Sequence, residues 1–283
     1  MGIDSTFSGC SALVTGGASG IGRALARELI RRGASVTVAD IDASGAEGAA
    51  TELGRCAVPA ALDVRDRSGF AALVDEVVAR HGRLDVLFNN AGVAVGGPTH
   101  ELSGAHWDAC IDINLGGVVN GVLAAYPGMV RQGHGRIVNT ASGAGLVAPP
   151  LVAPYATSKH AVVGLTRALR PEAARHGVQV QALCPGAVET PILDRRRDDL
   201  PATASEPVTA RQYLQLLRQS PITAERFAHD ALDAVGRNRS IIVVPRRASA
   251  LWYLDRLSPT LTDRLNRMLA GTVTKRLVHP VLE

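Results

Sequence analysis

A tyrosine and a lysine stand four residues apart in the segment Tyr155-Ala156-Thr157-Ser158-Lys159. On an α-helix this spacing places both side chains on one face. A tyrosine hydroxyl has an ordinary pKa of about 10, and a neighbouring ammonium group favours its ionised form and lowers that pKa. We therefore expect Tyr155 to exchange a proton with a substrate oxygen, with Lys159 lowering its pKa. The alternative is an exposed pair of helical residues without a chemical role.

Lysine is scarce in this chain, which draws attention to Lys159. Of the 30 Lys and Arg residues, only Lys159 and Lys275 are lysines. Arginine carries a planar, rigid guanidinium, whereas lysine carries a compact ammonium on a flexible stem, which suits donation to hydroxyl groups in a confined site. The lysine at position 159 therefore indicates that a compact cation is needed there.

Two more polar residues could serve the same reaction. Ser142 precedes Tyr155 by 13 residues and follows an expected strand, so its hydroxyl could hydrogen-bond the carbonyl oxygen that Tyr155 protonates. Asn114 lies in an expected helical stretch, where asparagine is a middling helix former. We expect Asn114 to hold a water molecule. The alternatives are a cap or turn role for the serine and a surface position for the asparagine.

A glycine-rich turn provides the expected cofactor site. The segment Thr15-Gly16-Gly17-Ala18-Ser19-Gly20-Ile21-Gly22 follows an expected strand and opens an expected helix. Glycine permits the tight turn and the close approach of the backbone to a pyrophosphate, and the helix N-terminus offers N–H groups and the positive end of its dipole. The residues expected to bind the cofactor here are Gly16, Ser19, Gly20, Ile21 and Gly22.

Asp40 determines which nicotinamide cofactor we expect. It ends the second expected strand, 18 residues after Gly22, and a carboxylate there can accept hydrogen bonds from both adenosine ribose hydroxyls while repelling a 2′-phosphate. The sequence therefore predicts NAD rather than NADP. Alternatively, Asp40 caps the next helix, a role that Asp42 can fill instead. Further cofactor contacts are expected where the third and fourth strands end, at Asp63, Val64, Asn90, Ala91 and Gly92.

The elements that must position these residues form a regular alternation of short apolar runs and longer helical stretches. The expected strands are Ser11–Thr15, Ser35–Asp40, Val58–Leu62, Val86–Asn89, Arg136–Thr140, Val178–Leu183 and Ile241–Val244. They are apolar at successive positions, which is typical of strands buried on both faces. Several helical stretches end on basic residues followed by glycine, namely Gly33, Gly82 and Gly177. This pattern predicts an α/β, doubly wound Rossmann-like fold, with a seven-stranded, mostly parallel sheet and helices on both faces.

The motifs together resemble one family. Thr-Gly-x-x-x-Gly-x-Gly, Asn-Asn-Ala-Gly, the interior Asn114, the serine 13 residues before the tyrosine, Tyr-x-x-x-Lys and Pro185-Gly186 occur in order over about residues 9–245. The chain is similar to the short-chain dehydrogenase/reductase family, in the branch with single-domain subunits. The resemblance implies that Tyr155 is the acid/base, Lys159 binds the nicotinamide ribose, Ser142 orients the substrate oxygen and Asn114 holds a water in a proton relay.

The same resemblance implies further contacts and an organisation. The segment near the nicotinamide carboxamide would contribute Pro185, Gly186, Val188 and Thr190. The resemblance also implies homo-oligomers, dimers or tetramers, formed through helix faces. We expect one catalytic domain over residues 1–283, with a lid at about residues 190–220 and a C-terminal extension at about residues 246–283. The extension is longer than the motifs require.

Composition narrows the remaining classes of function. The net charge is +4 without a long basic run, so nucleic-acid binding is not expected. The four cysteines, Cys10, Cys56, Cys110 and Cys184, are far apart, and the histidines form no metal-spaced cluster. We therefore expect free thiols in a cytoplasmic protein and no metal site. No apolar run in the sequence reaches the length of a membrane span.

The extension contains one expected amphipathic helix, at Ala248–Leu269. Its apolar stripe consists of Leu254, Leu257, Leu261, Leu265 and Met268. We expect this stripe to pack on the protein's own core or on a neighbouring subunit, in preference to a membrane surface.

Two apolar segments are expected to flank the reacting carbon. Gly143–Leu151 has no charged side chain, and Ala187–Leu193 has only Glu189. The basic cluster Arg195–Arg197 is expected to face solvent, so a substrate anion would lack a partner. The sequence therefore predicts a neutral, hydrophobic secondary alcohol or ketone as the small-molecule substrate. Alternatives are an NADP-dependent ketone or 3-oxoacyl reductase and a non-catalytic nucleotide sensor; the glycine spacing argues against a nucleotide-sugar epimerase.

Overall fold

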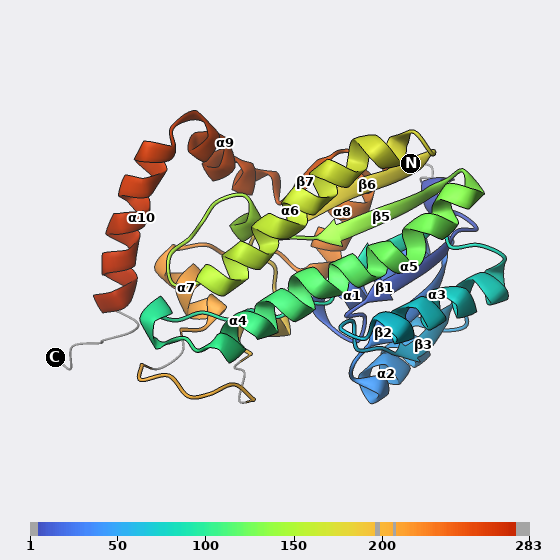
Figure 1. The fold of residues 1–283 in the computed structure, drawn as a ribbon, viewed down its shortest axis with the longest axis horizontal. Coiled ribbons are helices and arrows are strands. Elements are labelled where there is room, and N and C mark those ends of the chain that lie inside the picture. Colours follow the sequence, from blue (N-terminus) through green and yellow to red (C-terminus); the bar gives the residue numbers. More distant parts are fainter. Residues whose placement is uncertain (1–4, 196–198, 206–207, 276–283) are drawn as a thin grey trace.

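A seven-stranded parallel sheet forms the centre of the molecule (Figure 1). The computed structural model describes residues 5–195, 199–205 and 208–275. The strands are β1 (Ser11–Thr15), β2 (Ser35–Asp40), β3 (Ala57–Ala61), β4 (Val86–Asn89), β5 (Gly135–Thr140), β6 (Val178–Pro185) and β7 (Ile241–Val244). Their order in the sheet is β3-β2-β1-β4-β5-β6-β7, and every pair is parallel. This confirms the predicted fold class, and all residues of β1 and β4 are buried, as their unbroken apolar runs indicate.

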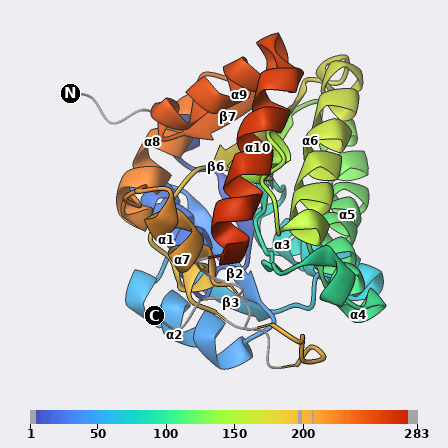
Figure 2. The same cartoon turned by 90° about the vertical axis from the view of Figure 1, so that its left-hand side faces the viewer.

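Helices cover both faces of the sheet (Figure 2). One layer consists of α1 (Gly20–Arg31), α2 (Ala43–Leu53) and α8 (Ala224–Gly236). The opposite layer consists of α3 (Arg67–His81), α5 (Gly117–Gln132) and α6 (Ala153–Ala174). Two apolar cores result, one on each side, which contain Leu25 and Phe227 in the first layer and Phe70 and Met129 in the second.

Three predicted helix ends are confirmed by backbone geometry. Gly33, Gly82 and Gly177 have φ values of 92°, 78° and 72°, a region that suits glycine because it has no Cβ. At Gly177 an added Cβ would lie 2.1 Å from the carbonyl oxygen of Gly133, so the turn is also too tight for a side chain. These turns return the chain to the sheet and fix the amino ends of the strands that follow.

The strand order reverses between β1 and β4, which places the site. From β1 the chain continues outward to β2 and β3, and it then crosses to β4 on the other side. In open α/β sheets a crevice for ligands forms at the carboxyl ends of the strands at this switch point. The glycine-rich turn follows β1 and the Asn90 segment follows β4, so both border this crevice.

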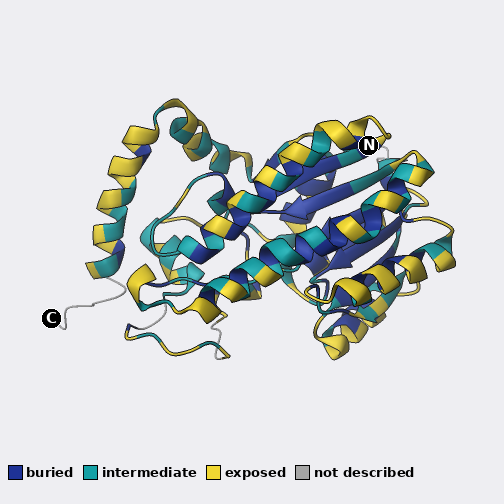
Figure 3. Ribbon diagram, in the orientation of Figure 1, coloured by how far each residue is buried: buried dark blue, intermediate teal, exposed yellow. Residues whose placement is uncertain are grey.

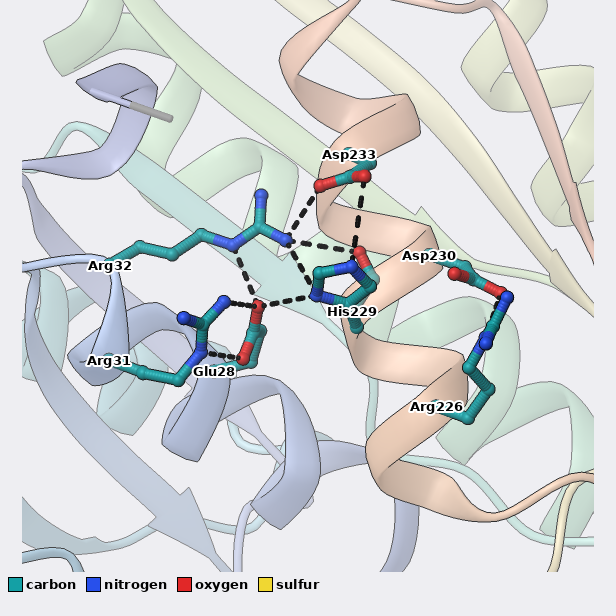
Figure 4. A network of polar contacts seen from close by, with 7 residues as sticks. All are labelled: Glu28, Arg31, Arg32, Arg226, His229, Asp230 and Asp233. Atoms are coloured by element: carbon teal, nitrogen blue, oxygen red, sulfur yellow. Dashed lines mark hydrogen bonds and ion pairs between the residues drawn. The ribbon is translucent and has the colours of Figure 1, made fainter. Parts of the chain in front are cut away.

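A buried polar network joins α1 to α8 on one side of the sheet, as Figure 4 shows. The Arg32 guanidinium is 2% exposed and donates to Asp233 at 2.7 Å and to Glu28 at 2.9 Å. It also donates to the carbonyl oxygen of His229 at 3.1 Å. The Arg31 and Arg32 hydrogen bonds help to hold the pKa of Glu28 at about 2, against the effect of burial, which raises it. This network lies at the amino end of β2, away from the carboxyl ends of the strands.

The C-terminal extension differs from the prediction of one helix over Ala248–Leu269. The structure has two helices, α9 (Ser249–Leu257) and α10 (Pro259–Val273), separated by Ser258 in a non-helical conformation. Proline lacks an N–H and disfavours the α conformation in the preceding residue, so Pro259 ends one helix and starts the next. Figures 1 and 2 show α10 crossing the end of the molecule toward which the strands point.

One long helical run is apolar enough for a membrane span by length and composition, which the sequence reading did not anticipate. It covers Gly104–Gln132 and comprises α4 (Gly104–Cys110), a π-helical turn η3 (Ile111–Gly116) and α5. Val122 and Met129 on this run are buried in the core of the α3, α5 and α6 layer, and Val118 is buried in a further apolar cluster with Val162 and Ala182. We therefore regard it as a core helix, since its apolar side chains already have protein partners.

Candidate active site

Helix α6 presents Tyr155 and Lys159 on the same side, at the carboxyl end of β5. The Lys159 ammonium lies 5.8 Å from the centre of the Tyr155 ring. It donates a 2.9 Å hydrogen bond to the carbonyl oxygen of Thr140, the last residue of β5. An added Cβ at Gly92 would lie 3.3 Å from the same nitrogen, so the Asn90–Gly92 segment borders the ammonium closely. The predicted Tyr-Lys pair is therefore one structural unit with the ends of β4 and β5.

The Lys159 ammonium is almost completely buried, at 3% exposure. Burial disfavours the charged form and lowers its pKa from 10.5 to about 8, although the nearby thiols of Cys110 and Cys184 act in the opposite direction. The head group is also closely bordered: an added Cβ at Gly92 would lie 3.3 Å from the Lys159 nitrogen. These constraints give a structural reason for lysine at this position in a chain rich in arginine.

The pKa of Tyr155 differs from the sequence expectation. Burial raises it above its ordinary value of 10.0, and the neighbouring thiols raise it further. The interaction that lowers it is a hydrogen bond with the Ser142 side chain, and not the charge of Lys159. The expectation considered the helical spacing alone, whereas Lys159 is turned toward Thr140 and shares the same buried surroundings.

Ser142 begins a short 3₁₀ turn, η4 (Gly143–Gly145), directly after β5. Its hydroxyl accepts a hydrogen bond from the N–H of Ala144 at 3.1 Å and lies close enough to Tyr155 to lower the pKa of the phenol. A serine hydroxyl and a phenol hydroxyl that lie side by side can both bond one oxygen atom of a substrate. The structure thus brings the two predicted residues together, although their roles remain predictions.

Asn114 is completely buried and lies in the π-helical turn η3. Its side-chain oxygen accepts from the N–H of Val93 at 2.8 Å, and its side-chain nitrogen donates to the Val93 carbonyl and to the Ser158 hydroxyl, both at 3.0 Å. π-Helical turns are rare in proteins, and those that occur are often found at functional sites. The position is therefore interior, which excludes the surface alternative, and the water-holding role remains a prediction.

Ser158 is a site residue that sequence reasoning did not single out. It is completely buried, accepts the hydrogen bond from Asn114 and donates to the Tyr155 carbonyl oxygen at 2.8 Å. A serine inside the Tyr-x-x-x-Lys segment, directly before the lysine, was the available signal, but its partner is 44 residues away. Ser158 thus connects the π-helical turn to the helix that carries Tyr155.

The glycine-rich turn after β1 has the geometry expected of a phosphate-binding turn. Gly16 and Gly20 have φ values of 66° and 51°. An added Cβ at Gly22 would lie 2.0 Å from the Gly16 carbonyl oxygen, and one at Gly16 would lie 2.9 Å from Ala91. Ser19 precedes α1 without capping it through its side chain, so the first N–H groups of the helix are not used by that hydroxyl. Ile21 is partly buried against the core of this layer.

The Asn90-Ala91-Gly92 segment is held against this turn by Thr15. The Thr15 hydroxyl accepts from the N–H groups of Asn90 and Ala91 at 2.9 and 3.1 Å. The Asn90 side chain donates in return to the Thr15 carbonyl at 3.0 Å. These bonds span some 75 residues of sequence and give the predicted cofactor residues of β1 and β4 a common, rigid position.

Asp40 ends β2 beside the glycine-rich turn, as predicted. One carboxylate oxygen accepts from the Ala18 N–H at 3.0 Å and the other from the Asp42 N–H at 3.1 Å. The next helix, α2, is capped by Asp42, which accepts from Gly45. The alternative role of Asp40 as the cap of this helix is therefore excluded.

Asp63 and Val64, which were predicted to contact the cofactor, follow β3. Val64 is buried, lies close to Gly117, and its carbonyl oxygen accepts from Asn120 at 2.9 Å. The Asp63 carboxylate is paired with Arg65 at 2.6 Å, and this hydrogen bond lowers its pKa. The sequence did not indicate that Arg65 pairs with Asp63. Because of this ion pair, the Asp63 carboxylate is less available to contact a ligand.

The segment after β6 reaches the glycine-rich turn from the opposite side. Pro185 is the last residue of β6, and the Gly186 N–H donates to Val244 at 2.8 Å. Val188 and Thr190 are buried, and the Thr190 side chain lies within 3.2 Å of the position that a Cβ of Gly20 would take. All four predicted residues thus lie along the border of the crevice.

Polar contacts hold the described part of the lid in place. Arg211 of α7 (Ala210–Leu216) is ion-paired with both Glu189 and Asp194. Farther along, the Glu101 carboxylate of η2 (Thr99–Glu101) accepts from the Ser205 N–H and hydroxyl, both at 2.7 Å. Arg195 is exposed, as predicted, whereas Arg196 and Arg197 lie outside the described residues.

Three apolar residues of the segments predicted to flank the reacting carbon are buried: Leu146, Val188 and Leu193. Leu146 lies in an apolar cluster with Ala141 and Val163, and Val188 lies in the core of the α1 and α8 layer. The charge of Glu189 is directed to Arg211. Within residues 5–195, 199–205 and 208–275, no group of three or more His, Cys, Asp or Glu side chains could hold a metal ion.

Comparisons with known proteins agree with this geometry. A family model described as short chain dehydrogenase matches residues 11–201. The 2,5-dichloro-2,5-cyclohexadiene-1,4-diol dehydrogenase of Sphingobium indicum is 41% identical over 197 residues, which cover 69% of this chain and 79% of that protein. The Mycobacterium tuberculosis protein named oxidoreductase SadH is 34% identical over 278 residues, 96% of this chain and 98% of its own. The solved structure of a short-chain dehydrogenase/reductase from Burkholderia phymatum in complex with NAD aligns with a TM-score of 0.82 at 32% identity, covering 90% of this chain and 96% of that one.

Proposed function

Because the chain belongs to the short-chain dehydrogenase/reductase family and is an oxidoreductase of alcohol or keto groups, we propose that it moves a hydride between NAD and a neutral, hydrophobic secondary alcohol or its ketone. The observation that carries this proposal is the placement of Tyr155 and the buried Lys159 on one side of α6, with the Lys159 ammonium 5.8 Å from the Tyr155 ring and bonded to the carbonyl oxygen of Thr140, two residues before Ser142. In this arrangement Tyr155 exchanges the proton of the reacting oxygen, and Ser142 holds that oxygen.

The residues of the crevice fit a dinucleotide. The tight turn at Gly16 and Gly22 leaves the backbone open to a pyrophosphate, and the start of α1 is not capped by the Ser19 side chain. When bound, the nicotinamide would supply or accept the hydride; Lys159 and the Thr190 segment would border it. The complex of the Burkholderia phymatum relative with NAD supports a nicotinamide dinucleotide as the ligand.

Asp40 supports NAD in preference to NADP. Its carboxylate is oriented by the N–H groups of Ala18 and Asp42, and it is not engaged in capping α2. A carboxylate fixed in this way accepts hydrogen bonds from ribose hydroxyls and repels a 2′-phosphate. The next residue, Ile41, is 67% exposed and offers no cation that could compensate.

The neutral class of substrate follows from the charges near the reacting oxygen. The lid has an arginine close to the crevice, Arg211, but two carboxylates, Glu189 and Asp194, already pair with it. An anionic substrate would have to displace these carboxylates or remain unpaired among apolar side chains, and the second alternative costs several kcal/mol. The two segments predicted to flank the reacting carbon, Gly143–Leu151 and Ala187–Leu193, carry only one charged side chain, Glu189, which suits a neutral substrate.

The proposal is tested by measuring oxidation of matched neutral and anionic secondary alcohols with NAD and with NADP, following the absorbance of the reduced cofactor. We expect kcat/KM to be highest for neutral cyclic or otherwise bulky alcohols with NAD. A clear preference for the anionic series contradicts the substrate class, and faster turnover with NADP contradicts the role of Asp40. A lack of turnover with every alcohol and ketone, despite cofactor binding, contradicts the proposed enzymatic function.

A further inference from the structure

Exposed apolar side chains are concentrated on the C-terminal helices. Among the described residues, eight large hydrophobic side chains are exposed, and six of them lie on α9 and α10; Figure 3 shows the exposed residues along α10. The six are Leu251, Tyr253, Leu257, Leu261, Leu265 and Met268. The sequence-based expectation was packing on the chain's own core or on a neighbouring subunit. Leu257, Leu261, Leu265 and Met268 of the stripe are exposed in this chain, and packing on a neighbouring subunit stays a prediction. Such concentration on one part of a surface indicates an interaction face.

Helix α10 has an inner and an outer side. Thr262 and Val273 are buried at 2% and 0% exposure, and Asn266 between them donates to the Ala148 carbonyl oxygen at 3.0 Å. Leu261, Leu265 and Met268 lie on the adjoining side of the helix, at helical spacing, and are 41%, 42% and 71% exposed. The helix is thus attached to the loop that follows Ser142, while Met268 and parts of Leu261 and Leu265 on its apolar side are left open to solvent in the described chain.

The same helices carry an excess of positive charge. Residues 246–275 contain six basic and only two acidic side chains, an excess of four, which equals the net charge of +4 of the entire chain. All six basic residues, including Arg256, Arg264 and Arg267, are exposed. The rest of the molecule is therefore neutral overall, and the exposed surface of the C-terminal helices is both apolar and basic.

We propose that the outer face of α9 and α10, defined by the six exposed hydrophobic residues and their flanking arginines, binds an anionic membrane surface. Helices with apolar residues beside Lys or Arg lie in the lipid interface, where the apolar side enters the headgroup boundary and the cations contact anionic lipids. Tyr253, which is 58% exposed, supplies an amphipathic aromatic group that suits this boundary, whereas the neighbouring Trp252 packs against the core of the molecule.

Charge favours a lipid surface over a second copy of the chain. In a two-fold symmetric dimer the same patch faces itself, so Arg256, Arg264 and Arg267 of one copy would approach those of the other. An anionic bilayer instead pairs every cation with a lipid of opposite charge. Because Asn266 links α10 to the loop after Ser142, membrane binding would also place the substrate crevice beside the phase in which hydrophobic alcohols concentrate.

The test is flotation of the full-length protein with phosphatidylcholine vesicles, prepared with and without phosphatidylglycerol. We expect binding to the vesicles that contain phosphatidylglycerol and its loss at high salt. The triple variants L261Q/L265Q/M268Q and R256Q/R264Q/R267Q should each bind about 10- to 100-fold more weakly. Leu123→Gln and Arg80→Gln, exposed positions on α5 and α3, are the matched controls and should bind like the wild type.

Circular dichroism and turnover of a water-soluble alcohol show whether the variants remain folded and active. Absence of wild-type binding to anionic vesicles overturns the proposal, and so does undiminished binding of both folded triple variants. Light scattering measures the oligomeric state of the wild type and of the variants, which tests whether copies of the chain bind each other through this face. An assembly of the wild type that L261Q/L265Q/M268Q dissociates, without any vesicle binding, would identify the face as a contact between copies of the chain. None of these outcomes depends on which cofactor or alcohol the enzyme uses.

Discussion

The side-chain nitrogen of Asn114 donates a 3.0 Å hydrogen bond to the hydroxyl of Ser158, one residue before Lys159. The same asparagine is bonded to both backbone groups of Val93, and Ser158 is bonded to the Tyr155 carbonyl. The bond therefore joins the segment after β4, the π-helical turn and the catalytic helix. Because Asn114 and Ser158 are both completely buried, the position of Tyr155 relative to the Asn90–Gly92 segment depends on this bond.

Replacement of Ser158 by alanine tests this connection. The Asn114 amide would be left with an unsatisfied buried donor, which costs about 1–3 kcal/mol of folding free energy. We expect Ser158→Ala to lower the melting temperature and to lower kcat, with a smaller change in the KM for NAD. Thr157→Ala, at the exposed neighbouring position on the same helix, should change neither quantity.

A double-mutant cycle with Asn114→Ala separates positioning from general loss of stability. If the two side chains act through their mutual bond, the effects of the two substitutions on kcat will be less than additive. Independent, additive effects would contradict the proposed connection.

Tyr155→Phe removes the exchangeable proton and keeps the ring. Loss of general acid/base catalysis lowers the rate about 10²- to 10⁴-fold. Binding of NAD, measured by calorimetry or by quenching of tryptophan fluorescence, should persist because the crevice is otherwise unchanged. Turnover of the phenylalanine variant near the wild-type level would contradict the role of Tyr155.

Lys159→Arg preserves a positive charge and still should be severely impaired. The Lys159 head group is buried, bonded to the Thr140 carbonyl and bordered by Gly92, which disfavours a planar guanidinium at the same place. The comparison of kcat for Lys159→Arg and Lys159→Met shows whether charge alone suffices. Equal impairment of the two variants is the expected result, and near-normal turnover of Lys159→Arg would contradict the steric argument.

Much of the fold could be predicted because strands buried on both faces leave a simple pattern. A run of successive apolar residues such as Val86–Phe88 predicts the position of a strand, here β4, to within a residue or two. Glycines such as Gly82 mark the ends of helices. The break at Ser258 was also readable, since Pro259 follows it; the apolar stripe across the break was given more weight than the proline.

Long-range contacts explain what the sequence could not supply for the site. The pairing of Glu101 with Ser205 and of Asn114 with Ser158 joins residues 104 and 44 positions apart, and no local spacing encodes it. The pKa of Tyr155 depends first on its burial by several elements, which raises it. The helical spacing with Lys159, taken alone, predicted a lowered pKa instead. Motifs identify the residues that act, whereas the residues that hold them in place require the structure.

The depressed pKa of Lys159 predicts a dependence of stability on pH. Between about pH 8 and its ordinary pKa of 10.5, the unfolded chain binds more protons at this residue than the folded chain, so its contribution to stability rises with pH. Below that range both states are protonated, and the full cost of burying the cation remains. Measured by urea unfolding, the stability of the wild type relative to Lys159→Met should increase by roughly 2 kcal/mol between about pH 8 and pH 10.

The only other lysine supplies the control for this measurement. Lys275→Met removes an exposed side chain, so the difference from the wild type should stay constant over the same range. A difference between wild type and Lys159→Met that is flat, or that falls with pH, would show that the Lys159 ammonium is not disfavoured by its surroundings.

Asp40→Ala should reduce the preference for NAD. Hydrogen bonds between a carboxylate and ribose hydroxyls contribute about 1.5–3 kcal/mol, which corresponds to roughly 10- to 100-fold in the Kd for NAD. Affinity for NADP should change less or improve, because a repulsive charge is removed. Asp42→Ala is the matched control: it removes the α2 cap, costs about 1 kcal/mol of stability, and should leave the ratio of the two Kd values unchanged.

The last prediction concerns the lid. Glu101 accepts two hydrogen bonds from Ser205, and both residues are largely shielded from solvent, so the bonds should hold this part of the lid over the crevice. In Glu101→Gln the charge is lost and one oxygen becomes an amide nitrogen, which cannot accept. Charged hydrogen bonds contribute about 1.5–3 kcal/mol, so the docked state of the lid should be disfavoured by roughly 10- to 100-fold. We expect the KM for the alcohol to rise more than kcat falls, and trypsin to cleave faster after Arg195. Glu76→Gln on α3, which breaks an exposed pair with Arg80, should have neither effect. If Glu101→Gln retains both the wild-type KM and the wild-type cleavage rate, the lid is held by its apolar contacts and by Arg211, and Glu101 has no part in substrate binding.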